Sequence, residues 1–445
     1  MAQVRYTRNL FLRGICIIYL FAFLSFYVQI PGLYGDNGIL PARTELDLKA
    51  RGPLLNKLKQ KPSFLWFAPY LGLNVEYMLD VLSLIGIILS FAGFISQRFC
   101  IAPIFAGLWS LYYSLYQIGQ TFMFFQWDVL LLEVGFLCII VAPFWYPYRG
   151  KSSTPSDVVT FWTVRWLLFR LMFASGVVKL TSGCPVWWKL DGKMILTEFN
   201  VPYSTLHQSH NSTIPIQLRQ IHAKVDHLHL VNSYGLFRRM TGIDGRPEVI
   251  IEGSDSIEGP WKEYEFLYKP GNVNNSLPFV APHQPRLDWQ MWFAALGTYN
   301  QNPWLMSLAY RLLSGQPEVL ALLNTVEKPF PDRPPKYIKA SLYHYHYTPW
   351  SQISKTHAWW TRERIGEYFP IFSQAHPPLI EYLTKMKILQ EKPGFKITNE
   401  PFKLILDNLR SLVRKIESSL LLWSVFTAGC VVIITGYNSS VSKKK

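Results

Sequence analysis

The sequence predicts a multi-pass α-helical membrane protein with a soluble α+β domain between its fifth and its last membrane span. About five segments before residue 182, and one more near the C-terminus, are long and apolar enough to cross a bilayer. Residues 232–297 are instead dense in aromatic and turn residues and lack any long apolar run, so this stretch must fold in water. Hydrophobic residues make up 49% of the 445 residues and charged residues only 16%, which fits several spans plus one sizeable polar domain.

The membrane domain is predicted over residues 1–182. Its first span is interpreted as an uncleaved anchor, because it is too long for the core of a signal peptide and no small-x-small cleavage site follows. The third and fourth spans meet at Gln126 and are expected to form a tight helical hairpin. The five predicted spans cover residues 10–30, 78–95, 101–125, 127–144 and 158–180.

The fourth and fifth predicted spans carry ionisable groups, which are costly in hydrocarbon unless they are paired or face a cavity. Asp128 and Glu133 lie toward the start of one helix, and Arg165, Arg170 and Lys179 lie on the next, which runs the opposite way. At a rise of about 1.5 Å per residue, Asp128 is expected near the depth of Lys179, and Glu133 near Arg170. We expect interhelical ion pairs; a proton relay or a catalytic lysine is the alternative.

Strands and helices are both predicted in the soluble domain, which spans residues 232–418 behind a connector at 183–231. Residues 246–253 and 261–268 have the composition and alternation of two strands, which pair as a hairpin through the loop between them. From Pro285 the apolar spacing becomes helical, and Gly297 is placed to end that helix. Further elements are a helix from Asn302 to Gly315, a strand at 337–347, an amphipathic helix at about 402–416, the last span at 419–437 and a basic cytosolic tail at 438–445.

No metal site, cofactor or catalytic group is predicted. His344 and His346 share one face of a predicted strand, and His227 and His229 form a second pair, but no third ligand follows at a diagnostic spacing. The five cysteines include no CxxC motif, which excludes a redox-foldase active site. The net charge of +15 comes without any nucleic-acid recognition motif, so no nucleic-acid partner is predicted.

Basic loops and glycosylation sequons predict the orientation. A cytosolic N-terminus puts Arg5, Arg8 and Arg98 on the cytosolic side and the soluble domain in the lumen, although the loop after the first span is also basic. The sequons at Asn211 and Asn274 then lie in the lumen and are expected to carry glycans. A third sequon, at Asn438, lies beyond the last span, where no glycan is expected.

Several long runs also carry a resemblance. They are FRLMFASGVVKL, YGLFRRMTG, RPEVIIEGS, EFLYKPG and PHQPRLDWQMWFAALG. These runs resemble the lipase maturation factors, and their second paralogue more than the first. The resemblance implies an endoplasmic reticulum membrane protein that assists the maturation of secreted proteins such as dimeric lipases of the lipoprotein lipase type. After CPVWW the family continues with further membrane spans that this chain lacks, so a central block is predicted to be missing.

Three classes of function compete. The first, which the resemblance implies, is a non-enzymatic factor that binds secreted clients through its lumenal domain. The second is a membrane enzyme that uses Lys179 or Glu133, distantly similar to the vitamin K-dependent carboxylase, and the third is a transporter. No small-molecule substrate is identified, and the membrane partner is lipid. Because aromatic residues and arginine dominate protein interfaces, the predicted client-binding residues are Phe237, Arg238, Arg239, Tyr264, Tyr268, Trp289 and Trp292.

Overall fold

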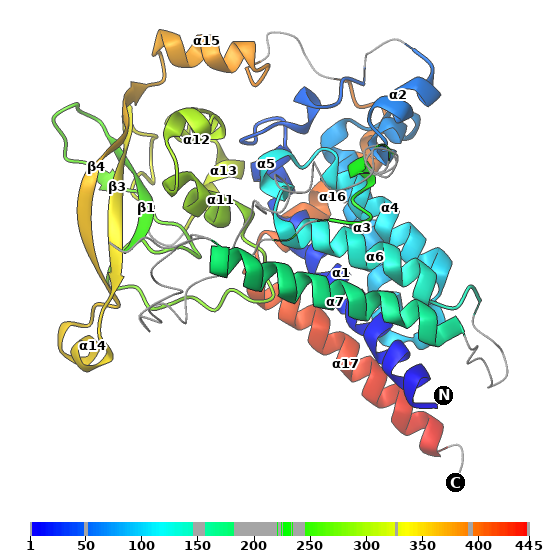
Figure 1. Cartoon of the computed structure of the whole chain (residues 1–445). Helices are drawn as coiled ribbons and strands as arrows, with labels where there is room; N and C mark the ends of the chain where they lie inside the picture. The colour runs from blue at the N-terminus through cyan, green and yellow to red at the C-terminus, as the bar shows by residue number, and fades with distance from the viewer. Residues whose placement is uncertain are drawn as a thin grey trace.

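A helical bundle and an α+β domain make up the protein (Figure 1). The computed structural model describes residues 2–48, 52–145, 156–181, 220, 224, 226–232, 234, 245–324, 328–389 and 395–442. The two chain ends lie at one end of the bundle, and the α+β domain lies at the other.

Four helices of the described chain are long and apolar enough to span a membrane. They are α1 (Ala2–Tyr34), α3 (Val75–Ile95), α7 (Ser156–Thr181) and α17 (Ser418–Ser442), whose candidate spans cover Tyr6–Tyr34, Val75–Ile95, Val158–Lys179 and Ser418–Thr435. Each corresponds to a predicted span.

The predicted third and fourth spans are shorter than expected. The structure has α4 (Ala102–Tyr116), a break with the single turn α5 (Gln120–Met123), and then α6 (Gln126–Val141). Helices of 15 and 16 residues reach about 24 Å, against about 30 Å of hydrocarbon. The expected helical hairpin is therefore present, but neither of its arms has the length of a full span.

Glycines let α1 and α3 pack closely. A Cβ atom on Gly86 would lie 2.6 Å from the Phe23 ring, and one on Gly93 would lie 2.5 Å from the Cys16 Sγ atom. Small residues at helix contacts are typical of membrane bundles, because close approach maximises van der Waals contact.

A four-stranded antiparallel sheet forms the outer layer of the α+β domain, in the order β2-β1-β3-β4. The predicted hairpin is confirmed, because Glu252 of β1 pairs with Glu263 of β2. Its second strand is shorter than predicted, since the chain leaves the sheet after Glu263 and Phe266 bridges to Leu323 instead. The strands are β1 (Arg246–Ser254), β2 (Lys262–Glu263), β3 (Tyr337–Tyr347) and β4 (Trp360–Ser373).

The edge strand β4 was not predicted from the sequence. Its charged residues, its Gly366 and three register shifts against β3 hide the alternation of apolar residues. Bulges, charges and a proline such as Pro370 also protect an edge strand from pairing with another chain. This edge is thus poorly suited to binding an added strand.

Three helices lie between the sheet and the bundle in Figure 1. The predicted helices are confirmed as α11 (Arg286–Ala295) and α12 (Trp304–Leu313), and α13 (Pro317–Leu320) follows. Val249 and Ile251 of β1 belong to the same hydrophobic core as the bundle, so the two parts share one interior.

The remaining elements connect these parts. Figure 1 shows α15 at the top of the view and α14 at the bottom of the sheet. The helices are α2 (Leu54–Gln60), α14 (Trp350–Thr356), α15 (Pro377–Lys385) and α16 (Glu400–Val413), and the short 3-10 helices are Ala42–Thr44, Phe64–Leu71, Gln97–Phe99, Asp226–Leu228 and Tyr299–Gln301.

Candidate functional site: the junction of the bundle and the α+β domain

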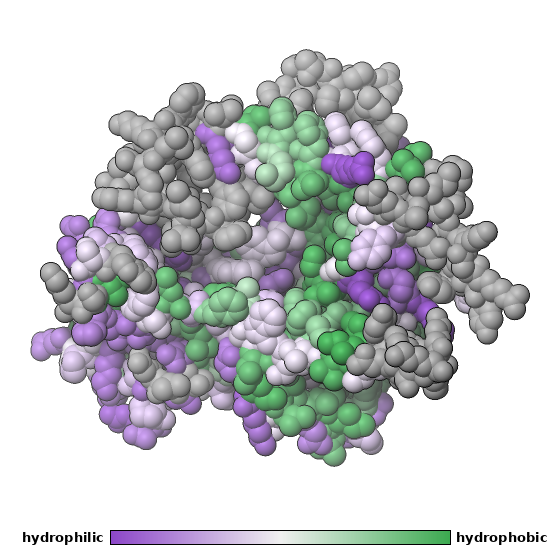
Figure 2. Space-filling view, turned by 90° about the horizontal axis from the view of Figure 1, so that it is seen from below, coloured by the Kyte–Doolittle hydropathy of each residue, from purple (hydrophilic) through white to green (hydrophobic). Residues whose placement is uncertain are grey.

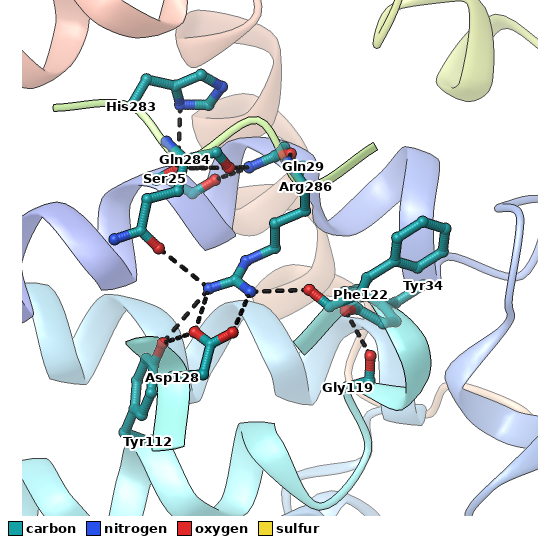
Figure 3. A network of polar contacts seen from close by, with 10 residues as sticks. All are labelled: Ser25, Gln29, Tyr34, Tyr112, Gly119, Phe122, Asp128, His283, Gln284 and Arg286. Carbon is teal, nitrogen blue, oxygen red and sulfur yellow. Dashed lines mark hydrogen bonds and ion pairs between the residues drawn. The ribbon is translucent and has the colours of Figure 1, made fainter. Parts of the chain in front are cut away.

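A buried arginine–carboxylate pair joins the two parts. Arg286 is the first residue of α11, and Asp128 lies in the first turn of α6. The guanidinium donates from Nη2 to Oδ1 at 2.8 Å and from Nη1 to Oδ2 at 2.9 Å, and both side chains are 0% exposed (Figure 3). The Tyr112 hydroxyl donates to Oδ1 at 2.5 Å, and the Phe122 carbonyl accepts from Nη1 at 2.8 Å. This planar, two-bond geometry fixes orientation as well as position.

Asp128 therefore has a different partner from the predicted one. Its expected partner was Lys179 at a similar depth in the membrane, whereas the structure gives it a guanidinium from the polar domain. The carboxylate sits at the end of α6 that faces this domain, so a cation entering from outside the bundle reaches it.

Polar residues of α1 hold the segment that leads into α11. The Ser25 Oγ atom lies 3.0 Å from Nδ1 of His283 and accepts from the Gln284 backbone N–H at 2.8 Å. Gln29 donates to the Gln284 carbonyl at 2.9 Å and accepts from the Arg286 N–H at 2.9 Å. These five residues, from α1 and from the segment 283–286, converge in Figure 3. The last turns of α1 therefore bind the polar domain.

A serine beside an imidazole is an arrangement found in nucleophilic catalysis. Ser25 is, however, 0% exposed, and its hydroxyl is already bonded to backbone groups of Gln284. Its role in this geometry is therefore to position the 283–286 segment.

A second buried carboxylate, Glu133 of α6, binds α7 and the segment before the sheet. It forms an ion pair with Arg170 and accepts from the Asn232 backbone N–H at 2.9 Å, the Asn232 amide at 3.1 Å and the Tyr234 hydroxyl at 2.6 Å. The structure thus brings together Glu133 and Arg170, the pair expected from their depths. Four donors leave the carboxylate little capacity to accept a proton from a substrate.

The other two predicted intramembrane cations lie on α7. Arg165 is exposed, with its guanidinium 5.9 Å from the centroid of the Phe161 ring. Lys179 is half-buried near the end of the helix.

A third group of charges lies around β1 and the start of α11. Glu248 of β1 is fully buried and pairs with Lys269 at 3.1 Å and with Arg246 at 2.6 Å. Asp288 of α11 accepts from the Tyr268 N–H at 2.8 Å. Burial raises the pKa of Asp288 to about 7, and burial lowers the pKa of His283 to about 4. Asp288 lies two residues after Arg286 and His283 lies three residues before it, so the junction contains two titrating groups.

These shifts predict a pH dependence. Asp288 binds a proton more tightly in the folded state, so from about pH 4 to 7 its contribution to stability falls as pH rises. His283 binds one less tightly, so from about pH 4 to 6.5 its contribution rises with pH. The two effects oppose each other, each with a slope of at most about 1.4 kcal/mol per pH unit.

In Asp288→Asn, the opposing contribution of Asp288 is removed, and the pH dependence of stability is expected to follow His283 alone. Thermal unfolding of the purified protein should show a Tm that rises more steeply between about pH 4 and 6.5 in the variant than in the wild type. Asp255→Asn, at an exposed site, is the matched control and should follow the wild-type profile. Parallel profiles for Asp288→Asn and the wild type would contradict the shift assigned to Asp288.

The predicted client-binding residues have different environments. Tyr264 and Trp292 are each only 5% exposed, so they are core residues that leave little surface for a partner to contact. Tyr268 and Trp289 are half-buried at the junction, where Trp289 packs edge-on against Trp127 at 4.6 Å. Phe237, Arg238, Arg239 and the sequon residue Asn211 lie outside the described residues, whereas Asn274 is exposed.

The outer face of the sheet is a surface that sequence reasoning missed. Helices lie against the inner face of the sheet in Figure 1. Lys339 and Tyr343 alternate along β3 with the core residues Ile338 and Ala340, so they lie on the opposite, outer face. Lys339 lies 4.1 Å from the centroid of the Trp261 ring, and Arg362 lies 4.8 Å from that of Tyr343. The exposed Arg364 is the sheet partner of Tyr343. Because strand β4 was not predicted, the sequence did not indicate on which face of the sheet its arginines lie.

The sequence analysis also did not predict four residues of the junction, which are Arg286, His283, Ser25 and Gln29. One signal was available: Ser25 and Gln29 are polar residues inside an otherwise apolar span. Such residues need partners, which here come from a segment more than 250 residues away. Among the described residues, no group of three histidine, cysteine, aspartate or glutamate side chains is placed to hold a metal ion.

Comparisons with known proteins cover most of the chain. The profile described as "Lipase maturation factor transmembrane domain" matches residues 6–230, and that described as "Lipase maturation factor C-terminal domain" matches residues 230–370. No solved structure matches the chain.

Relatives of both numbered types are found. The chain is 30% identical to lipase maturation factor 2 of Gallus gallus, over 97% of this chain and 90% of that protein. It is 31% identical to lipase maturation factor 2 of Homo sapiens, over 96% of this chain and 91% of that protein. It is 27% identical to lipase maturation factor 1 of Mus musculus, over 82% of this chain and 86% of that protein. The alignment to the Gallus gallus protein has 645 positions, more than the 445 residues of this chain, so it includes many positions at which this chain has no residue.

Proposed function

Because this chain belongs to the lipase maturation factor family, we propose that it is an endoplasmic reticulum membrane protein that assists the folding, assembly and export of secreted lipases by non-covalent binding. The observation that carries the proposal is the junction. It holds an α+β domain in one orientation at the end of the bundle opposite both chain termini. A domain fixed in this way presents one face to proteins in the compartment that it faces.

Client binding is proposed for the outer face of the sheet, around Trp261, Tyr343 and Arg364. Aromatic residues and arginine supply most of the binding energy at protein interfaces. Phe237, Arg238 and Arg239, which lie outside the described residues, remain predicted client-binding residues. The saturated hydrogen bonding of Glu133 supports a structural role for that carboxylate over the alternative enzymatic one.

Co-purification tests this surface. The chain carrying both Trp261→Ala and Arg364→Ala should recover at least about tenfold less of a co-expressed dimeric secreted lipase than the wild type, because loss of each hot-spot residue costs about 1–2 kcal/mol. Tyr70→Ala, at an exposed aromatic residue outside the sheet, is the matched control and should recover as much lipase as the wild type. Equal recovery by all three proteins would remove the outer face from the proposal.

The proposed orientation has a cytosolic N-terminus and a lumenal α+β domain. The basic loop after α1 then lies on the lumenal side, against the usual bias of basic residues toward the cytosol. Two of its cations have partners within the fold: Arg43 donates to the Ile388 carbonyl at 2.8 Å, and Lys61 pairs with Glu45 at 2.5 Å. These contacts support a loop that folds with the domain.

Glycan mapping tests the orientation. Asn274→Gln should remove one endoglycosidase H-sensitive glycan, because Asn274 is exposed on the domain. Asn438→Gln, beyond the last candidate span, should leave the electrophoretic mobility unchanged. Loss of a glycan on Asn438→Gln, with none lost on Asn274→Gln, would place the domain in the cytosol.

A further inference from the structure

Helix α16 is held at both of its ends close to residues where candidate membrane spans begin. At its N-terminal end, the Asn399 backbone N–H donates to the Gly72 carbonyl at 3.2 Å. Farther along the helix, Arg410 of α16 pairs with Glu76 and Asp80 of α3, both at 2.6 Å, and the Tyr77 hydroxyl donates to Asp407 at 2.6 Å. The candidate span of α3 begins at Val75. At the other end, α16 stops at Val413 and the span of α17 begins at Ser418. The helix is therefore held beside the border of the bilayer.

The face of α16 that binds α3 is not its only apolar face. Leu406 is buried against α3, next to Leu73 and Tyr77. Ile405 and Leu412 are 56% and 59% exposed, and with Leu409 they repeat at the four- and three-residue spacing of one helical stripe, which Ile416 continues just beyond the end of the helix at Val413. A stripe of exposed leucine and isoleucine beside a membrane helix has no partner among the described residues.

A loop that packs against α17 presents apolar groups next to the same border. Phe279 is 72% exposed and its ring stacks on Trp423 of α17 at 6.4 Å. The Trp423 indole donates to the Ala281 carbonyl at 3.2 Å, and Leu277 of this loop is also exposed. Tryptophan with one apolar and one hydrogen-bonding end is typical of the membrane–water interface.

Positive charge accompanies these apolar groups. Arg414 and Lys415 lie between α16 and α17, and both are exposed. Seen from below, hydrophobic side chains gather over the membrane helices, whereas the side of the sheet is mostly hydrophilic (Figure 2). Apolar residues flanked by basic ones suit the glycerol and phosphate layers of a phospholipid bilayer.

We propose that α16 and the loop at 277–281 bind phospholipid at the membrane surface. The stripe of Ile405, Leu409, Leu412 and Ile416 enters the upper acyl region, and Arg414 and Lys415 contact lipid phosphates. Continuity of this stripe with the lipid-facing surface of α17, of which only 17% is buried, favours lipid over a protein partner. The surface holds the α+β domain at a fixed height and tilt over the bilayer.

Site-specific fluorescence on the full chain in phosphatidylcholine nanodiscs tests the proposal. Cys184 and Cys430 are first changed to serine, and Ile405→Cys, Leu412→Cys and the matched control Ser411→Cys are each labelled with bimane. Ser411 is exposed on the same helix, outside the stripe. Lipid carrying a doxyl group near the top of the acyl chain should quench the probes at 405 and 412 severalfold more than the probe at 411, and aqueous iodide should show the reverse order.

Two outcomes would overturn the proposal. Iodide quenching at 405 and 412 as strong as at 411 would mean that the stripe faces water. Resistance at 405 and 412 to both quenchers would mean that another protein segment covers it. A second measurement addresses the charges: Arg414→Gln with Lys415→Gln should reduce doxyl quenching at 412, and unchanged quenching would remove phosphate contact from the proposal.

Discussion

Arg286→Met is expected to destabilise the folded protein by about 3–5 kcal/mol, because it leaves the carboxylate of Asp128 buried without its charge partner. Thermal unfolding in detergent should show a lower Tm, and the boundary between the bundle and the α+β domain should become sensitive to protease. The effect is large because neither side chain has access to water, so no solvent replaces the two hydrogen bonds that are lost.

An exposed ion pair provides the matched control. Arg333 and Asp255 are paired at 3.2 Å with side chains 71% and 43% exposed, so Arg333→Met should cost about 0–1 kcal/mol. The double variant Arg286→Met with Asp128→Leu should recover part of the loss, because it buries no unpaired charge. If Arg286→Met had no more effect than Arg333→Met, the junction would not depend on this pair.

Gly32→Val is expected to separate α13 from α1. A Cβ atom at Gly32 would lie 2.5 Å from the Glu318 carbonyl oxygen and 2.7 Å from the Leu322 side chain. The carbonyl belongs to the backbone and cannot rotate away, so helix α13 must move, at a cost of about 1–3 kcal/mol or more for an overpacked core. The expected result is a lower Tm together with less co-purified lipase.

Gly176→Val on α7 is the control for this substitution. Nothing lies within 4 Å of a Cβ atom at Gly176, and replacing glycine in a helix is intrinsically favourable. Its Tm should therefore equal or exceed that of the wild type. A Gly32→Val protein as stable as Gly176→Val would show that the contact between α1 and α13 adjusts freely.

The two variants act on the junction in different ways. Arg286→Met removes an electrostatic contact on α6, and Gly32→Val removes shape complementarity at α1. If the α+β domain acts on clients only when it is held in one orientation, both variants should reduce lipase maturation in cells even when the α+β domain itself remains folded. Variants on the outer face of the sheet should reduce maturation without lowering the Tm.

The sequence alone determined the local elements of this protein. Runs of apolar residues placed the four long helices, and the period of alternation placed β1, β3, α11 and α12, because each of these signals lies within one element. The depth argument also led to Glu133 and Arg170, since the rise of a helix is fixed. The apolar runs were less reliable for the lengths of the spans, because α4 ends at Tyr116, where the chain turns to contact the polar domain.

Only the tertiary structure decided which groups meet across long separations. The rise of a helix matched Asp128 with Lys179 by depth, whereas Arg286, 158 residues away, binds it. Tyr264 and Trp292 have the residue types of a binding surface, yet the packing of α11 against β1 buries the tryptophan. Local periodicity records which side of an element is apolar, whereas the identity of the partner depends on how whole elements pack, and no short stretch of sequence contains that information.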